Sequence, residues 1–199
     1  MKFCCPVILA SASPRRKELL AGMGIEFAPI SAEVEEISSC AGSPAEEIAR
    51  RNACLKAAAV STLYPDSLVI GADTIVVCSG RIFGKPQTAD EAFSMLRTLS
   101  GREHEVMSGV ALLRGENGLD RSFVEVSRVV FKDLSDADIR EYMAKVNVMD
   151  KAGAYAIQEH SEMILSKLDG SLSNVIGLPV ERLRQELLQT GLALPGRKN

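Results

Sequence analysis

The residue that most clearly points to chemistry is Asp73. It interrupts the apolar run of residues 67–78, which has the pattern of a strand buried on both faces. A carboxylate there is costly unless it is paired with a cation or bound to a metal, and the nearby Gly71 indicates a bulge or a close backbone approach. We interpret Asp73 as a working carboxylate at the end of a central strand. The alternative is an aspartate that caps a local turn.

A basic cluster follows a short apolar run near the start of the chain. Ser13 can cap a helix, and Pro14 suits the first helical position because its missing N–H costs nothing there. Arg15, Arg16 and Lys17 then occupy the first turn, where the helix dipole favours anions over cations. Bare helix N–H groups and two guanidinium forks together predict a phosphate site. The alternative is a solvated basic turn.

Two lysines also lie in unusual surroundings. A capping box at Ser43 predicts a helix that runs to about residue 63, and Lys56 falls in the middle of its inward face. The alternative for Lys56 is a side chain whose stem merely covers apolar surface. Lys85 lies between a glycine and a proline that fix its backbone. The predicted inward face of this helix comprises Ile48, Asn52, Leu55, Ala59 and Leu63.

Taken together, these charges suit a polyphosphate ligand. Acidic Glu33, Glu35 and Glu36 lie in the loop before this helix, and magnesium typically uses one or two carboxylates together with the oxygens of its substrate. The sequence has no P-loop motif and no pattern of a covalent nucleophile. His104 and His160 have no partner spacing, and we interpret both as surface or structural residues.

The composition argues against a nucleic-acid-binding, membrane-bound or disulfide-stabilised protein. The chain has 199 residues, 46% of them apolar, and a net charge of −3, which does not favour nucleic-acid or acidic-membrane partners. Its five cysteines are odd in number and lack metal-binding spacing, which fits a reducing cytosol. The first apolar run is too short for a signal peptide or a membrane span. We therefore expect a cytoplasmic protein.

The elements that must position these residues alternate between strands and helices. Strands are predicted at residues 7–10, 25–30, 67–78 and 163–168, and a long hairpin at 104–131. Helices are predicted after Ser13 and at 43–63, 88–99, 135–144 and 180–189. This order favours an α/β fold with a mixed sheet and flanking helices. We expect one domain over residues 1–199, with a flexible tail from about residue 192.

The chain resembles the Maf family of nucleotide pyrophosphatases, often labelled septum formation proteins. Six motifs carry the resemblance, which extends from about residue 7 to 188: SASPRR at 11–16, GADTIV at 71–76, GKP at 84–86, LSG at 99–101, DKAGAY at 150–155 and VIGLP at 175–179. The resemblance implies an inosine triphosphatase-like fold with two lobes around a cleft. It also implies a homodimer that uses magnesium or manganese.

The resemblance further implies roles for individual residues. Asp73 would be the general base that activates water, and Glu36 the best candidate metal ligand, with Asp73 as a second possible one. The phosphates would be held by Arg15, Arg16, Lys56 and Lys85, and Ser13, the serine of the SPRR motif, would be a further catalytic residue. The positions that choose the base would be Arg15, Thr74 and Gln158.

The family also has branches with different substrates. The sequences around Thr74 and Gln158 resemble the branch that hydrolyses dTTP and UTP to the monophosphate and pyrophosphate, and a glutamine amide can both donate to and accept from a pyrimidine edge. Two alternatives remain open. One is a pyrophosphatase for 7-methyl-GTP, and the other is a non-catalytic nucleotide-binding regulator of septation.

Overall fold

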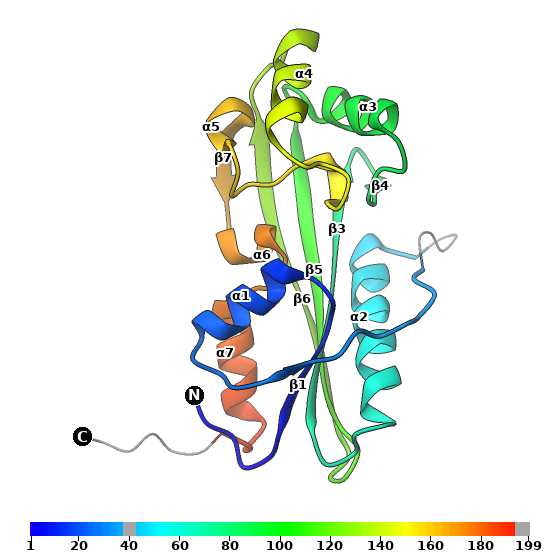
Figure 1. The fold of residues 1–199 in the computed structure, drawn as a ribbon, viewed down its shortest axis with the longest axis vertical. Helices are drawn as coiled ribbons and strands as arrows, with labels where there is room; N and C mark the ends of the chain where they lie inside the picture. Colours follow the sequence, from blue (N-terminus) through cyan, green and yellow to red (C-terminus); the bar gives the residue numbers. More distant parts are fainter. Residues whose placement is uncertain (38–42, 194–199) are drawn as a thin grey trace, which may run out of the picture.

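The computed structural model describes residues 1–37 and 43–193 and has a mixed α/β fold (Figure 1). In this part of the chain seven strands form one sheet, in the order β2-β1-β3-β5-β6-β7, with β4 also paired to β3. The strands are β1 (Val7–Ala10), β2 (Ala28–Pro29), β3 (Leu68–Cys78), β4 (Arg81–Phe83), β5 (Glu103–Arg114), β6 (Leu119–Phe131) and β7 (Leu165–Asp169). Strands β2, β1 and β3 are parallel, and the remaining pairs are antiparallel. The predicted mixed sheet is confirmed.

Helices cover both faces of this sheet and define two lobes. The helical elements are α1 (Pro14–Gly22), α2 (Ala45–Ser61), α3 (Ala89–Leu99), α4 (Asp136–Lys145), the 3-10 turn η1 (Ala152–Ala154), α5 (Ser161–Ile164), α6 (Leu172–Ile176) and α7 (Val180–Gln189). One apolar core forms between α1, α7 and the sheet, and another between α3, α4 and the far end of the sheet. Figure 1 shows these two groups of helices at opposite ends of the long strands, with α2 on the other side of the sheet from α1 and α7.

Strand β3 is the element on which the two lobes meet. One of its edges pairs continuously with β5, from Val69 to Val77. Its other edge pairs with β1 as far as Gly71 and with β4 from Val76 onward. Among the described strands, residues 72–75 therefore have no partner on that edge. The sheet splits at this point, so Asp73 and Thr74 lie where a ligand can approach them.

Two glycines bring α2 unusually close to the sheet. A Cβ atom added at Gly71 would lie 2.3 Å from the carbonyl oxygen of Ala53, and one at Gly109 would lie 2.2 Å from that of Ala49. Real Cβ atoms essentially never come this close, so only glycine fits at either position. The close backbone approach predicted for Gly71 is confirmed, and it sets the distance between the side chains of α2 and those of β3.

We expect the substitution Gly71→Ala to lower the free energy of unfolding by about 3 kcal/mol, because the added methyl must push α2 off the sheet. Chemical denaturation of the purified variant measures this loss. Gly22→Ala is the matched control, since a Cβ there meets nothing within 4 Å, and alanine in a helix is about 0.5–1 kcal/mol better than glycine. An equal effect of both substitutions would contradict the close packing.

The structure corrects the predicted face of α2. The residues that it buries are Ile48, Ala49, Asn52, Ala53, Lys56, Ala57, Val60 and Ser61. By contrast, Leu55, Ala59 and Leu63 of the predicted face are exposed, because α2 turns the side of Ala49, Ala53 and Ala57 toward the sheet and ends at Ser61, before Leu63. The predicted capping box is also absent: the helix begins one residue later, with Pro44 at the capping position and no side-chain cap.

Other predicted boundaries also differ. The second strand shrinks to the two residues of β2, because the short β1 offers pairing only to Ala28 and Pro29. Helices α5 and α6 are single turns that give no periodic pattern, and they were not predicted. The predicted tail starts too early: Leu192 is buried in the core, and Ala193 pairs with Phe3. Residues 194–199 lie outside the described residues.

Candidate active site

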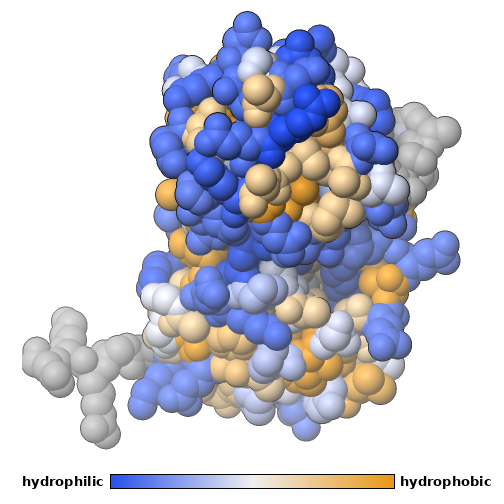
Figure 2. Space-filling model, turned by 45° about the horizontal axis from the view of Figure 1, so that its top comes forward, coloured by the Kyte–Doolittle hydropathy of each residue, from blue (hydrophilic) through white to orange (hydrophobic). Residues whose placement is uncertain are grey.

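A cavity of about 470 Å³ opens at the split edge of β3, between the two lobes. Figure 2 shows hydrophilic residues along the hollow between the two ends of the molecule. Every site residue predicted from the sequence lines this cavity: Ser13, Arg15, Arg16, Glu36, Lys56, Asp73, Thr74, Lys85 and Gln158. A smaller adjoining hollow of about 310 Å³ is shared by the start of α1, Lys56 and Lys85. The fold thus gathers residues that lie up to 145 positions apart in the sequence.

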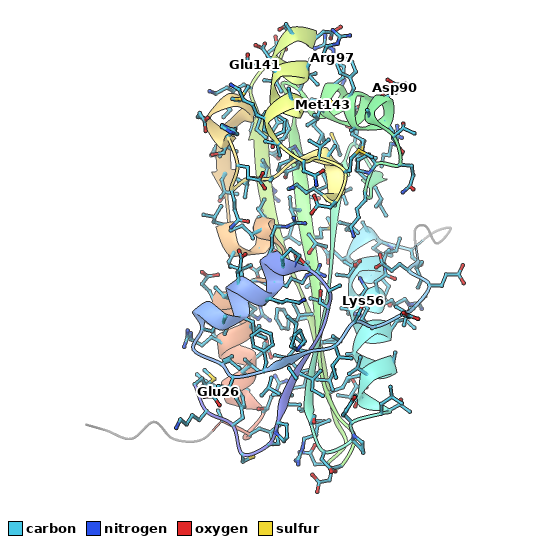
Figure 3. All side chains as sticks on the ribbon, viewed as in Figure 1. Glu26, Lys56, Asp90, Arg97, Glu141 and Met143 are labelled. Atoms are coloured by element: carbon cyan, nitrogen blue, oxygen red, sulfur yellow. The ribbon has the colours of Figure 1, made fainter. Side chains whose placement is uncertain are left out.

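Asp73 points toward α2, where Lys56 meets it. The Lys56 Nζ atom lies 2.7 Å from Asp73 Oδ1 and 2.8 Å from Glu36 Oε1. Figure 3 shows Lys56 on α2; its side chain and that of Asp73 are only 11% and 7% exposed. A cation at hydrogen-bonding distance compensates a carboxylate that burial would otherwise make costly. The lysine therefore holds two carboxylates from separate elements within reach of one point.

Asn52, one turn before Lys56, makes the second contact to this carboxylate. Its Nδ2 donates to Asp73 Oδ2 at 3.1 Å and to the carbonyl oxygen of Ile37 at 3.1 Å. Its Oδ1 accepts from the backbone N–H of Ile37 at 2.8 Å. The two oxygens of Asp73 thus have different partners on α2, and the same amide fastens the segment that carries Glu36.

Thr74 faces the opposite side of the sheet, because successive strand residues alternate between faces. Its hydroxyl lies 3.0 Å from Arg16 Nη2 and 2.8 Å from the hydroxyl of Ser108 on β5. Arg16 also donates from Nε to the carbonyl oxygen of Gly177 at 2.9 Å. Burial lowers the pKa of the Arg16 guanidinium, and the carboxylates of Asp73 and Glu36 oppose that shift. The arginine remains a cation between α1, β3 and the end of α6.

Arg15 reaches across the cleft to the other lobe. It donates from Nη1 to Asp150 Oδ2 at 2.9 Å and from Nη2 to the carbonyl oxygen of Asp150 at 3.2 Å. Burial acts to raise the pKa of Asp150, but hydrogen bonds from Lys151 and Arg15 outweigh it, so this pKa lies below its ordinary value. An ionised Asp150 therefore ties α1 to the segment that leads to Gln158.

The remaining predicted residues border the same cavity. Ser13 caps α1 as predicted, since its hydroxyl accepts from the backbone N–H of Arg16. Lys85 and Gln158 have exposed side chains on the rim, and both belong to the lobe opposite α1. The cavity thus receives cations from α1, α2 and the segment after β4.

Two details of the sequence interpretation are settled by this geometry. Asp73 does not lie at the end of its strand: β3 continues for five residues beyond it, because β4 and β5 keep pairing with it. All three loop acids are exposed, but only Glu36 contacts Lys56 and lines the cavity, whereas Glu33 and Glu35 are not among its described lining residues.

Sequence reasoning missed three polar residues that the structure brings into the site. Asn52 was placed on the inward face of its helix, and a polar residue there was a usable signal. Asp150 and Lys151 belong to a recognised motif, but nothing in their spacing connects them with Arg15. That connection depends on how α1 and the segment before η1 face each other across the cleft.

The donor set fits a hard divalent cation only in part. Magnesium and manganese prefer carboxylate oxygens, and magnesium commonly takes one or two from the protein and the rest from water and phosphate. Asp73 and Glu36 offer two such carboxylates near one point. Among the described residues, no cluster of three or more histidine, cysteine, aspartate or glutamate side chains is arranged to hold a metal alone. The fit therefore requires oxygens from a bound phosphate.

A buried polar group supports the cavity wall near Gln158. His104 Nε2 lies 3.0 Å from the hydroxyl of Tyr155, and the Tyr142 hydroxyl accepts from the N–H of Ala156 at 3.0 Å. Burial lowers the pKa of His104 to about 4 and raises that of Tyr142 to about 12. His104 is therefore a neutral structural residue at physiological pH, in agreement with the interpretation from the sequence.

This neutral histidine predicts acid sensitivity. Between pH 6.5 and 4 the unfolded chain binds a proton at His104 and the folded protein does not, so stability falls as the pH falls. We expect a loss of about 3 kcal/mol from this group over that range. Urea unfolding at a series of pH values measures it, with His104→Gln as the comparison. Parallel pH curves for the two proteins would contradict this expectation.

A mixed α/β fold with a carboxylate and several cations around an interlobe cavity defines a class of phosphate-binding α/β proteins. The family model described as Maf-like protein matches residues 6–190. The chain therefore belongs to the Maf family, as the six sequence motifs indicated.

Curated relatives extend this finding. A dTTP/UTP pyrophosphatase of Akkermansia muciniphila is 51% identical over 88% of this chain and 91% of the relative. A dTTP/UTP pyrophosphatase of Methylococcus capsulatus is 47% identical over 94% of this chain and 91% of the relative. A solved nucleoside-triphosphatase / dITP/XTP pyrophosphatase of Mycobacterium abscessus superposes with a TM-score of 0.42 at 17% identity, over 65% of this chain and 75% of that one. In the part of the chain that the structure describes, no helix is both long and apolar enough to cross a membrane.

Proposed function

We propose that this protein hydrolyses pyrimidine nucleoside triphosphates, dTTP and UTP, to the monophosphate and pyrophosphate. The observation that carries the proposal is the buried Asp73 carboxylate at the split edge of β3, inside a cavity that five cationic side chains border. A triphosphate needs such charge neutralisation. The relatives named dTTP/UTP pyrophosphatase support the choice of substrate.

In this proposal Asp73 is the general base. A carboxylate has about four lone-pair sites, and the contacts from Lys56 and Asn52 use two of them, which leaves room for a water molecule. The water oxygen attacks the α-phosphorus, its proton passes to Asp73, and the bond from the α-phosphorus to the bridging oxygen breaks. Pyrophosphate leaves with that oxygen and the electron pair.

The cations hold the phosphates during this step. Arg16 and Lys56 are fixed by the fold on either side of β3, and Lys85 closes the rim from the other lobe. Ser13 caps the helix whose first residues line the adjoining hollow. Glu36 and Asp73 would hold a magnesium or manganese ion together with the phosphates, and this ion would supply further charge neutralisation.

The base would be selected by Arg15, Thr74 and Gln158. We expect Gln158→Leu to lower kcat/KM for dTTP and UTP by about 10-fold or more, because the amide can no longer pair with the pyrimidine edge. Pyrophosphate release measures the loss. Gln189→Leu is the control, since Gln189 contacts Arg121 far from the cavity. An unchanged preference among bases would contradict this role for Gln158.

A panel of substrates tests the activity itself. Purified protein is supplied with dTTP, UTP, CTP and 7-methyl-GTP in the presence of magnesium or manganese, and pyrophosphate is measured. We expect release from dTTP and UTP. Preferred hydrolysis of 7-methyl-GTP would favour the other branch, and no release from any substrate would refute the proposal.

The oligomeric state, the location and the cellular role of the protein are proposed from the resemblance to the Maf family. We propose that the whole chain acts as one domain in a cytoplasmic homodimer, and that its activity influences septum formation. A purely regulatory role is the second candidate. It would be favoured if Asp73→Asn still altered septation in cells after losing turnover.

A further inference from the structure

We propose that Asn52 is a positioning residue for this reaction, which locks Asp73 and the segment that carries Glu36 into one geometry. The proposal rests on the proposed function and adds a residue to it. Asn52 would act through its neighbours, by holding the orientation of one carboxylate and the place of another.

Both polar atoms of the Asn52 side chain are hydrogen bonded. Asn52 is 2% exposed, and it makes three hydrogen bonds, two to Ile37 and one to Asp73. The orientation of the amide follows from its partners, because the N–H of Ile37 requires an acceptor while the Asp73 carboxylate requires a donor. A flipped amide would lose every one of these bonds.

The position is costly for a polar residue. Asn52 lies on the buried face of α2, between Ala49, Ala53 and Lys56, where a leucine of similar size would satisfy the packing. Burying an amide costs free energy unless it is hydrogen bonded. Removing this amide would leave Asp73 Oδ2 and the backbone groups of Ile37 without these partners, so its contribution is expected both in the stability of the fold and in the geometry of the site.

Two geometric consequences follow from these bonds. The contact at Oδ2 prevents the Asp73 carboxylate from rotating about its terminal bond, so the lone pairs left for water keep a fixed direction. The two bonds to Ile37 hold the backbone next to Glu36, whose carboxylate then meets Lys56. Without Asn52, the exposed Glu36 side chain would be tied to the site by Lys56 alone among its described contacts.

The variants Asn52→Leu and Asn52→Asp test this proposal. Both keep the size of the side chain, and both remove the donor to Asp73. For Asn52→Leu we expect kcat/KM to fall about 10- to 100-fold, in line with the loss of other residues that orient site ligands. We expect the melting temperature to fall as well, so kcat/KM is compared per folded molecule. A merely structural asparagine would lower the melting temperature and keep kcat/KM per folded molecule.

Amide hydrogen exchange gives a readout that needs no turnover. In the wild type the N–H of Ile37 is bonded to Asn52, so its exchange is slowed; in Asn52→Leu we expect it to exchange at least about 10-fold faster. The amide of Ile8 in β1 is the internal reference. Equal protection of Ile37 in both proteins would overturn the proposal.

The two variants differ in charge. Asn52→Asp places a second carboxylate against Asp73, in a site that already holds the charges of Lys56, Glu36 and Arg16, with Lys85 on the rim. Because this variant lacks the donor to Asp73 and adds a like charge beside it, we expect its kcat/KM at pH 7 to be at least as low as that of Asn52→Leu. A wild-type kcat/KM in Asn52→Asp would overturn the proposal.

The outcome for the wild type keeps the two proposals distinct. If the wild type releases no pyrophosphate from any substrate, the proposed function fails, and the positioning role fails with it. If the wild type is active and Asn52→Leu has the same kcat/KM, only the positioning role is refuted.

Discussion

Asp73→Asn is expected to lower kcat by about 10³-fold or more, because the amide cannot accept a proton from water. Asparagine keeps the size of the side chain, and its oxygen can still accept from Lys56, which also retains Glu36 as a partner. We therefore expect the fold to survive. Pyrophosphate release under saturating dTTP or UTP measures the effect, and near-ultraviolet circular dichroism checks the packing.

Asp66→Asn provides the matched control for this variant. Asp66 is an exposed aspartate two residues before β3, so the substitution removes the same charge from the same part of the chain without entering the cavity. We expect its kcat to equal that of the wild type. A variant of Asp73 that retains near wild-type turnover would exclude Asp73 as the general base.

Lys56→Met is expected to have the largest combined effect on stability and activity. It leaves the buried Asp73 carboxylate without its cation. Removing one partner of a buried ion pair typically costs 3–5 kcal/mol, because the other charge stays buried. We expect a loss of about 3 kcal/mol in the free energy of unfolding at pH 7, since Asn52 still donates to Asp73. The variant should also lose at least about 100-fold in kcat/KM, through the missing phosphate contact.

The exposed pair Lys145–Glu141 supplies the control. Its two atoms lie 2.6 Å apart, similar to the Lys56–Asp73 distance, but the side chains are 44% and 58% exposed. Lys145→Met should therefore change stability by less than about 1 kcal/mol. Equal deficits for both lysine variants would refute the buried ion pair.

The sequence alone determined the class of fold and the identity of the charged residues. The apolar run around Asp73 predicted a central strand, because a strand buried on both faces needs apolar side chains at nearly every position. Ser13 and Pro14 predicted the start of α1, since caps are local chemistry. Gly71 predicted close packing, and Lys56 was visible as a cation on an inward helix face.

Only the tertiary structure decided how these residues meet. The split edge of β3 arises because β1 and β4 pair with different parts of one strand, and no local pattern encodes that gap. The face of α2 was mispredicted because the two glycines of the sheet, and not the helix, set which side chains fit. Asn52, Asp150 and Lys151 entered the site through contacts between distant segments. Helix caps and strand patterns depend on residues that are neighbours in the sequence, whereas a site between two lobes depends on distances that only the packed sheet fixes.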